Sequence, residues 1–415
     1  MRQIIKKFLA FSERYTKTDM TYLAKGGFWI SISYSIQIIS GLILTVALAN
    51  LLPKNVLGTY QYILALAGIL SVLTLSGASK AIVSAVARGD DGAFLSSVRT
   101  VLKWNIIILL SSLSVSCYYY LNGNTELGTA FLIVAFFAPL IEAFKLYQSY
   151  LQGKEAFKDG VTLGAWRKPL PLIAMIIGLY FTDNVVYLIF VYFFTNAVSN
   201  IWVYFLVIRK YHPPIKAKED VLSYSKHLSI LVIIGKLASH ADKLILWQFI
   251  GPVAVASFTI AQLATKYSGG ALNALATIVL PKLSRRDLAT LQQTLPRKVF
   301  FFTLAMSVGA IIYILVIPFI FDIIFPQYKE SILIAQLLAV SLVFLPRSIY
   351  TKALIAHQQV RYQYYLSISM LVLSIIAMLV LIPIFGILGA AYATIISELV
   401  SAIVSYSLFK RAKSV

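Results

Sequence analysis

Four titratable side chains interrupt an otherwise apolar stretch, IIGKLASHADKLILWQF, which runs from 233 to 249. They are Lys236, His240, Asp242 and Lys243. A lysine or an aspartate at the centre of a membrane-spanning helix costs about 2.5–3.5 kcal/mol on insertion scales. Such residues therefore face a bundle interior or a water-filled cavity, where they pair with one another or bind a ligand. A row of cations in such a place predicts a site for an anion.

The cations of this stretch share one helical face. Steps of three and four residues lead from Lys226 through Lys236 and His240 to Lys243, and at about 100° per residue they stay within about 100° of arc. Lys226 and Lys243 could instead snorkel to the two interfaces, which needs no function. Lys236 lies too near the middle of the stretch for that. We predict that these four basic residues line a substrate cavity, whereas Asp242 lies on another face and pairs with another helix as a structural or coupling residue.

The next apolar stretch carries a second polar face. Gln262, Lys266 and Asn273 lie on it, and Gly270 would leave room there for a ligand or for close approach of another helix. Hydrogen bonding between helices is the alternative explanation of such a face. We add Gln262, Lys266 and Asn273 to the predicted cavity residues.

Weaker candidates lie on three other apolar stretches. Lys25 precedes a mild polar stripe that includes Gln37, and Arg347 lies on the polar side of a later stretch, so these three join the cavity set. Glu142 and Lys145 are three residues apart on one face, which predicts a structural ion pair or a coupling role. Among all the candidates, cations outnumber carboxylates. A cavity of net positive charge suits an anionic substrate, and Lys and Arg both bind phosphate.

The composition places these residues in a membrane protein. The chain has 415 residues, of which 59% are hydrophobic and 13% are charged, and its mean hydropathy is +0.82. Soluble proteins have about 45–50% apolar and about 25% charged residues. The formal charge of +20 fits basic cytoplasmic loops better than nucleic-acid binding. Cys117 is the single cysteine, so the sequence offers neither a disulfide framework nor a thiolate metal site, and we expect no cofactor.

Twelve apolar stretches are long enough to cross a bilayer, and they predict an all-α polytopic membrane protein. Basic residues gather in the N-terminal arm, in the even-numbered loops and in the C-terminal tail, whereas the odd-numbered loops carry Lys54, Lys329 and little else that is basic. Twelve spans with both termini in the cytoplasm therefore put nearly every loop cation inside. The predicted spans are 27–51, 57–80, 101–120, 127–151, 161–181, 185–208, 222–249, 253–280, 298–321, 330–355, 360–383 and 387–409.

The two halves of the chain resemble each other weakly. LLPKNVLGTYQYILALA (51–67) aligns with FIGPVAVASFTIAQLAT (249–265) at an offset of 198 residues. Six spans separate the copies, so the halves run in the same direction, as in parallel transporter repeats. Chance similarity of apolar segments is the alternative. We predict a cytoplasmic N-terminal arm (1–26), a six-helix bundle (27–208), a cytoplasmic linker (209–221), a second six-helix bundle (222–409) and a cytoplasmic tail (410–415).

Absent motifs narrow the function further. The sequence has no Walker A motif, no Gly-rich phosphate loop, no HExxH and no Cys cluster. It also offers no long outer loop for a soluble catalytic domain. We therefore predict that the protein is not an enzyme, and a membrane glycosyltransferase or polymerase is the weakest alternative.

With these features the sequence resembles the polysaccharide-biosynthesis flippases (Wzx type) of the multidrug/oligosaccharidyl-lipid/polysaccharide (MOP) exporter superfamily. The stretch LASHADKLILWQFIGPVAVASFTIAQLATK and the later IVLPKLSR carry the resemblance. They match the family's pattern of an aspartate late in the seventh helix, a Gly-containing turn, an aromatic residue early in the eighth helix and a P-x-L-S exit. The resemblance implies a V-shaped, MATE-like pair of bundles around a central cavity lined by helices one, two, seven and eight.

The resemblance also implies a substrate and a location. The substrate would be an undecaprenyl-pyrophosphate-linked oligosaccharide, such as an O-antigen repeat unit, moved from the inner to the outer leaflet of the bacterial cytoplasmic membrane by alternating access. Expected partners are this lipid-linked oligosaccharide, membrane lipid and the polysaccharide polymerase machinery, but not nucleic acid. One alternative is a multidrug exporter of the same superfamily, which would want carboxylates in its cavity. Another is a lipid II flippase, which usually has fourteen helices. Coupling to Na⁺ or H⁺, the sugar and the oligomeric state stay open.

Overall fold

The protein is described by a computed structural model over residues 20–164, 167–215, 221–270, 283, 287–357 and 359–412. Every regular element in these ranges is a helix, which confirms the all-α membrane fold. By length and composition, eight helices in these ranges could cross a membrane, and they occupy the predicted spans two to four, six and nine to twelve. Shorter apolar helices mark the first, fifth and eighth spans. The charged helix α12 (Val221–Phe249) fills the seventh.

Helix ends are set by side chains that satisfy free backbone groups. Asn184 accepts hydrogen bonds from the N–H groups of Val186 and Tyr187, at 2.9 and 3.2 Å, where the sixth span begins. Pro252 occupies the first turn of α13, where its missing N–H leaves no bond unmade.

The elements in chain order are α2 (Met20–Leu51), α3 (Lys54–Leu70), η1 (Ser71–Leu73), α4 (Ala78–Ala87), α5 (Gly92–Trp104), α6 (Ile106–Leu121), α7 (Thr125–Phe144), α8 (Tyr147–Gly153), α9 (Phe157–Leu163), α10 (Pro169–Phe181), α11 (Val185–Tyr211), α12 (Val221–Phe249), α13 (Pro252–Ala261), α15 (Leu288–Ile324), η2 (Pro326–Ser331), α16 (Ile332–Leu342), η3 (Leu345–Arg347), α17 (Ser348–Ala356), α18 (Val360–Phe385) and α19 (Ile387–Arg411).

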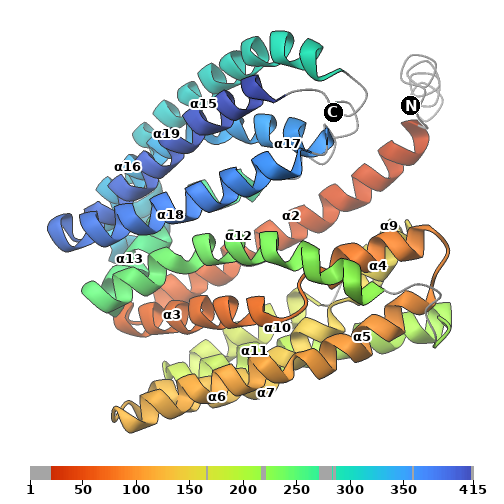
Figure 1. Cartoon of the computed structure of the whole chain (residues 1–415). Coiled ribbons are helices and arrows are strands. Elements are labelled where there is room, and N and C mark those ends of the chain that lie inside the picture. The colour runs from red at the N-terminus through yellow and green to blue at the C-terminus, as the bar shows by residue number, and fades with distance from the viewer. Residues whose placement is uncertain are drawn as a thin grey trace, which may run out of the picture.

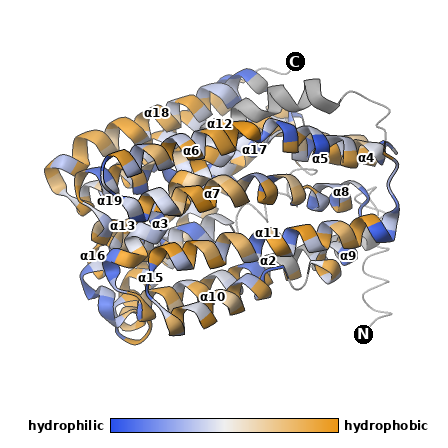
Figure 2. Ribbon diagram, turned by 90° about the horizontal axis from the view of Figure 1, so that it is seen from below, coloured by the Kyte–Doolittle hydropathy of each residue, from blue (hydrophilic) through white to orange (hydrophobic). Residues whose placement is uncertain are grey.

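Two groups of helices face each other, with α2 and α12 between them (Figure 1). One group runs from α3 to α11 and the other from α15 to α19. Helix α12 packs on α18 of the second group and also on α3 and α4 of the first, and α13 packs on α3. Hydrophobic residues dominate the helices, and hydrophilic residues gather towards the ends (Figure 2). This distribution suits helices whose outer faces contact lipid.

The buried core is shared at one end of the molecule and divided at the other. One cluster joins both groups, because it includes Tyr60 of α3, Phe258 of α13 and Phe321 of α15. A second cluster has buried members between residues 75 and 207, all in the first half, and a third has members between 283 and 412, all in the second. The halves therefore meet at one end and separate at the other, as the resemblance implied for a V-shaped pair.

Two helix breaks fall at equivalent places in the two halves. Helix α7 is capped by Lys145 before α8 begins, and α16 is capped by Val343 before η3 begins. The two caps are 198 residues apart, which is the offset of the sequence repeat. The backbone thus favours a true repeat over chance similarity, while the domain boundaries stay predictions.

The halves also exchange equivalent contacts across the molecule. A Cβ on Gly41 of α2 would lie 2.9 Å from the hydroxyl of Tyr267, which follows α13. A Cβ on Gly68 of α3 would lie 2.7 Å from Nε2 of His240 on α12. The repeat offset of 198 residues carries Gly41 to position 239, next to His240, and Gly68 to position 266, next to Tyr267. The two contacts are therefore equivalent to within one residue. The first helix of each half therefore lies close against the second helix of the other half.

The joined end is closed by contacts that we call the outer latch, formed by Asn50, Lys54, Ile324, Gln327 and Glu330. The side-chain amide of Asn50 donates to the carbonyl of Ile324 at 2.8 Å, and Gln327 donates to the carbonyl of Asn50 at 3.1 Å. Lys54 forms an ion pair with Glu330. The basic-residue pattern predicts that these loops lie on the outer side of the membrane.

At the divided end, α9 and α11 of the first half are joined to each other by an ion pair and a hydrogen bond. Lys210 of α11 pairs with Asp159 of α9 at 2.6 Å, and the Tyr211 hydroxyl donates to the same carboxylate. These hydrogen bonds hold the pKa of Asp159 below its usual value. The basic-residue pattern predicts that this end lies in the cytoplasm, and in that orientation the V would open towards the inner side.

Candidate functional site

Helix α12 lies along α3 and η1, and its stripe of cations faces them. The ammonium of Lys243 donates to the side-chain oxygen of Gln61 at 2.9 Å, and that of Lys236 donates to the Ser71 hydroxyl at 3.2 Å. Between these two contacts His240 rests against Gly68. The predicted shared face of Lys236, His240 and Lys243 is therefore the face that α12 turns towards the first half. We call this boundary between α12 and the first half the seam.

The first half meets the stripe with a broken helix. Helix α3 gives way to η1, and Thr74 then adopts an extended backbone, with ψ of 165°, before α4 begins. Buried Asn105 holds the break in place, because it interacts with the Thr74 hydroxyl at 2.5 Å and donates to the carbonyl of Pro139 at 2.8 Å. Broken helices at membrane depth are tolerated where they line a cavity, and transporters build their sites from them.

One carboxylate lies beside two ammonium groups in the outer part of the seam. Asp242 is buried and accepts a hydrogen bond from the N–H of Lys243 at 2.8 Å. The side chain of Gln262, at the end of α13, also interacts with Asp242. Lys243 and Lys266 both interact electrostatically with this carboxylate, and Lys266 is exposed. The cluster of Asp242, Lys243 and Lys266 keeps a net positive charge, and a structural or coupling role for Asp242 stays a prediction.

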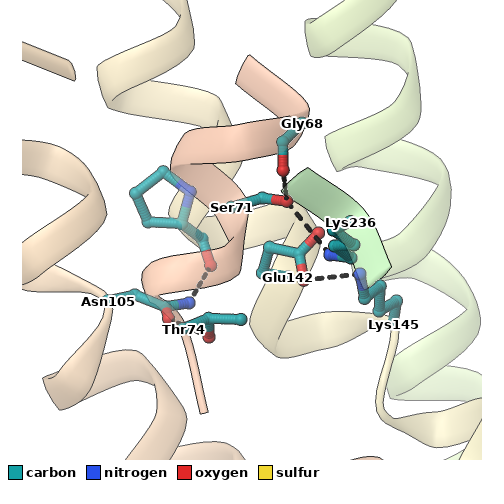
Figure 3. A network of polar contacts seen from close by, with 8 residues as sticks. Gly68, Ser71, Thr74, Asn105, Glu142, Lys145 and Lys236 are labelled. Atoms are coloured by element: carbon teal, nitrogen blue, oxygen red, sulfur yellow. Dashed lines mark hydrogen bonds and ion pairs between the residues drawn. The ribbon is translucent and has the colours of Figure 1, made fainter. Parts of the chain in front are cut away.

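A second cluster occupies the inner part of the seam (Figure 3). Lys145 pairs with Glu142 at 2.5 Å, and Glu142 also lies close enough to interact electrostatically with Lys236. The Ser71 hydroxyl, which accepts from Lys236, donates to the carbonyl of Gly68 at 2.7 Å. Glu142, Lys145 and Lys236 line a cavity of about 210 Å³, together with residues of the break before α4 and of its first turn. The structure therefore brings Glu142 and Lys145 to the same seam as the predicted cations.

The remaining predicted residues are spread more widely. Arg347 does not join the seam cluster, since its guanidinium makes two hydrogen bonds to Glu398, at 2.9 and 3.1 Å. Gln37 is exposed on α2. The side chains of Lys25 and Lys226 and the whole of Asn273 lie outside the described residues. Within those residues, no group of three His, Cys, Asp or Glu side chains could hold a metal ion, so the site offers ammonium, hydroxyl and amide groups.

Several partners in the seam did not emerge from the sequence. Gln61, Gly68 and Ser71 supply the first-half side, and Tyr62 stacks on Trp247 with ring centroids 4.2 Å apart. The spacing of Gln61, Gly68 and Ser71, seven residues and then three, places them on one helical face. That spacing is the signal that could have found them.

A comparison with known families decides the assignment. A model of the polysaccharide biosynthesis protein family matches residues 23–286, which is more than half of the chain. The chain belongs to this family. A capsular polysaccharide biosynthesis protein, CapF of Staphylococcus aureus, is 24% identical over 376 residues, which cover 86% of this chain and 92% of CapF.

Solved structures confirm that the family member has the fold of MOP-superfamily transporters. An inward-facing multidrug-resistance MATE transporter of that superfamily matches with a TM-score of 0.71 at 15% identity, covering 90% of this chain and 94% of its own. A MOP-superfamily transporter from Pyrococcus furiosus, described as having a binding pocket of reverse polarity, matches with a TM-score of 0.67 at 16% identity, covering 94% and 95%. The resemblance seen in the sequence is thus confirmed for the polysaccharide biosynthesis family and for the fold.

Proposed function

We propose that this protein is a flippase that moves a diphosphate-linked lipid oligosaccharide from the inner to the outer leaflet of the bacterial cytoplasmic membrane. The family concerns polysaccharide biosynthesis, and the fold is that of transporters. The seam carries the proposal. Its described residues include Lys145, Lys236, Lys243 and Lys266 but only the carboxylates Glu142 and Asp242.

The excess of ammonium groups selects the kind of substrate. Each phosphoryl group of a disubstituted diphosphate keeps a negative charge, and lysine ammonium groups bind phosphate oxygens well. Where the substrate leaves bulk water to bind along the seam, these lysines would offset the desolvation of the diphosphate. Gln61, Gln262 and Ser71 supply amide and hydroxyl groups that could bind sugar hydroxyls. An exporter of organic cations would instead need carboxylates in excess.

The divided core and the outer latch give a route for alternating access. Substrate would enter where the halves are apart, and its head group would bind along the seam. Opening of the outer latch, with closure of the inner end, would then release it outside. An inside-negative potential drives negative charge outward, and this movement releases about 2.3 kcal/mol per uncompensated charge per 100 mV. Coupling to Na⁺ or H⁺ stays a prediction, with Glu142, Lys145 and Asp242 as its candidates.

A flipping assay in proteoliposomes tests this function. A fluorescent diphosphate-linked oligosaccharide is placed in the vesicle membrane, and a membrane-impermeant reagent reports the fraction that reaches the other leaflet. We expect wild-type protein to flip it well above empty vesicles. Lys243→Gln or Lys266→Gln should slow flipping about tenfold, the cost of one charge-assisted hydrogen bond.

The matched control replaces a lysine that lies away from the seam. Lys210→Gln removes an ammonium that pairs with Asp159 at the divided end, and it should leave the flipping rate unchanged. Equal rates for wild type and both seam variants would remove the seam from the mechanism.

A further inference from the structure

The inner cavity is separate from the outer seam cluster. It lies between the broken second span, α7 and α12, and is lined on its polar side by Thr74, Ser76, Ser79, Glu142, Lys145 and Lys236. Its volume is about 210 Å³. Lys236 and Lys243 are seven residues apart on α12, which is about 10.5 Å along the helix axis. The seam therefore has two positively charged places rather than one.

The charges of the inner cavity leave one ammonium in excess. Lys145 is matched by Glu142 at 2.5 Å, so Lys236 must share that carboxylate. Its other contact is the neutral hydroxyl of Ser71. An ammonium has three N–H groups, so Lys236 can still donate to an anionic oxygen.

The hydroxyl groups of the cavity differ in how they are used. The Thr74 hydroxyl is held by Asn105, whereas the Ser76 hydroxyl is buried and has no hydrogen-bond partner among the described residues. Ser76 precedes α4 and Ser79 lies in its first turn, where the helix dipole favours a negative group. The cavity thus combines one unmatched cation with a free hydroxyl.

The separation of the two cationic places argues against a single diphosphate that fills both. The two phosphoryl groups of a diphosphate share one bridging oxygen, whereas Lys236 and Lys243 donate to Ser71 and Gln61, ten residues apart on the first-half side. The inner place therefore suits a second anionic group of the same substrate. A carboxylate on a sugar ring is such a group, since it carries one negative charge and has hydroxyl groups beside it.

We propose that the inner cavity binds the carboxylate of an acidic sugar in the oligosaccharide, with Lys236 as its specificity-determining residue. The outer cluster of Lys243 and Lys266 then holds the diphosphate. This inference rests on the proposed flippase function. It restricts the substrate to lipid-linked oligosaccharides that carry a uronic-acid type of sugar.

The test compares two substrates of equal length in the proteoliposome assay. One carries a uronic acid, and in the other the same sugar has its carboxylate reduced to a neutral hydroxymethyl group. We expect the wild type to flip the acidic substrate about tenfold faster or more, because the neutral analogue loses one charge-assisted hydrogen bond. Lys236→Gln should lose this preference and flip the acidic and the neutral substrate at the same rate. Lys236→Arg should keep part of the preference, which separates a charge effect from misfolding.

The outcomes distinguish this inference from the function on which it rests. If neither substrate is flipped by the wild type, the proposed function fails and the inference fails with it. If the wild type flips both equally, the function stands and the inference is overturned. If Lys236→Gln slows both substrates alike, Lys236 serves the diphosphate and the inference is again overturned. Lys243→Gln is the control, since it should slow both substrates by the same factor.

Discussion

At the scale of residues, the decisive distinction is between cations with a matching carboxylate and cations without one. Arg347 makes two hydrogen bonds to Glu398, with side-chain exposures of 12% and 25%. Lys236 and Lys243 instead donate to the neutral oxygens of Ser71 and Gln61. The seam lysines can therefore accept an anionic ligand, whereas Arg347 is held as part of the second half.

Removing the partner of Arg347 should therefore lower the stability of the protein and leave its transport rate unchanged. Glu398→Ala leaves a largely buried guanidinium without its carboxylate, a loss of about 1–3 kcal/mol. We expect a lower unfolding temperature in detergent, with the flipping rate per folded molecule retained. Arg361→Gln, which removes an exposed cation in the same half, is the control and should leave the unfolding temperature unchanged. A normal unfolding temperature with slow flipping would instead make the Arg347 pair part of the transport mechanism.

The sequence could predict the stripe but not its partners. Lys236, His240 and Lys243 belong to one helix, so the helical period alone puts them on one face. The side chains that meet them come from residues more than 160 positions earlier, and no local period links the two stretches. For the same reason the sequence could not reveal the partner of Arg347, because Glu398 is 51 residues away on another helix.

At the scale of elements, the two halves are held together where α3 crosses α13. A Cβ on Gly58 would lie 1.8 Å from the backbone carbonyl oxygen of Pro252, a distance that no side-chain movement can relieve. The crossing therefore needs a glycine at this place. The aligned segments that revealed the repeat in the sequence are the same two that pack here.

Gly58→Ala should accordingly push α3 and α13 apart. We expect a clear drop in the unfolding temperature, because the backbone shift disrupts a shared core and overpacking costs about 1–3 kcal/mol. Gly309→Ala on α15 is the matched control, since nothing lies within 4 Å of the added Cβ. It should be neutral, or slightly stabilising through its helix propensity. Equal unfolding temperatures for the two variants would refute the close crossing.

The ion pair that joins α9 to α11 predicts that the stability of the folded protein depends on pH. Because Lys210 and Tyr211 lower the pKa of Asp159 in the folded protein, the ionised carboxylate adds stability above its unfolded pKa of about 3.9. This contribution is lost as the pH falls through the lower folded value. The difference in unfolding temperature between wild type and Asp159→Asn should therefore be constant near neutral pH and vanish in acid. A difference that grows on acidification would contradict this assignment.

At the scale of the whole molecule, the two ends of the V differ in how they are built. The joined end has one core common to both halves and the outer latch, and the divided end has a core for each half. The resemblance implied a V, and the cores agree with it. The latch contacts hold the joined end closed. The sequence could not reveal them because they join residues 274 and 277 positions apart.

Locking the outer latch should stop transport reversibly. In a Cys117→Ser background, Asn50→Cys with Gln327→Cys places two thiols where a direct hydrogen bond now joins the halves. A short crosslinker should abolish flipping, and a cleavable one should allow recovery on reduction. Asp322→Cys with Lys329→Cys is the control, since this pair lies 2.7 Å apart within the second half and should be harmless when linked. Full flipping by the locked Asn50–Gln327 protein would refute alternating access through this end.

The most direct measurement of the central claim offers the wild-type protein both classes of cargo in proteoliposomes. One set of vesicles carries a fluorescent diphosphate-linked oligosaccharide, and the other carries a fluorescent organic cation. The excess of lysines along the seam predicts flipping of the oligosaccharide well above protein-free vesicles, reduced about tenfold by Lys243→Gln, and no movement of the cation. Transport of the cation without flipping of the oligosaccharide would contradict the account and identify a multidrug exporter instead.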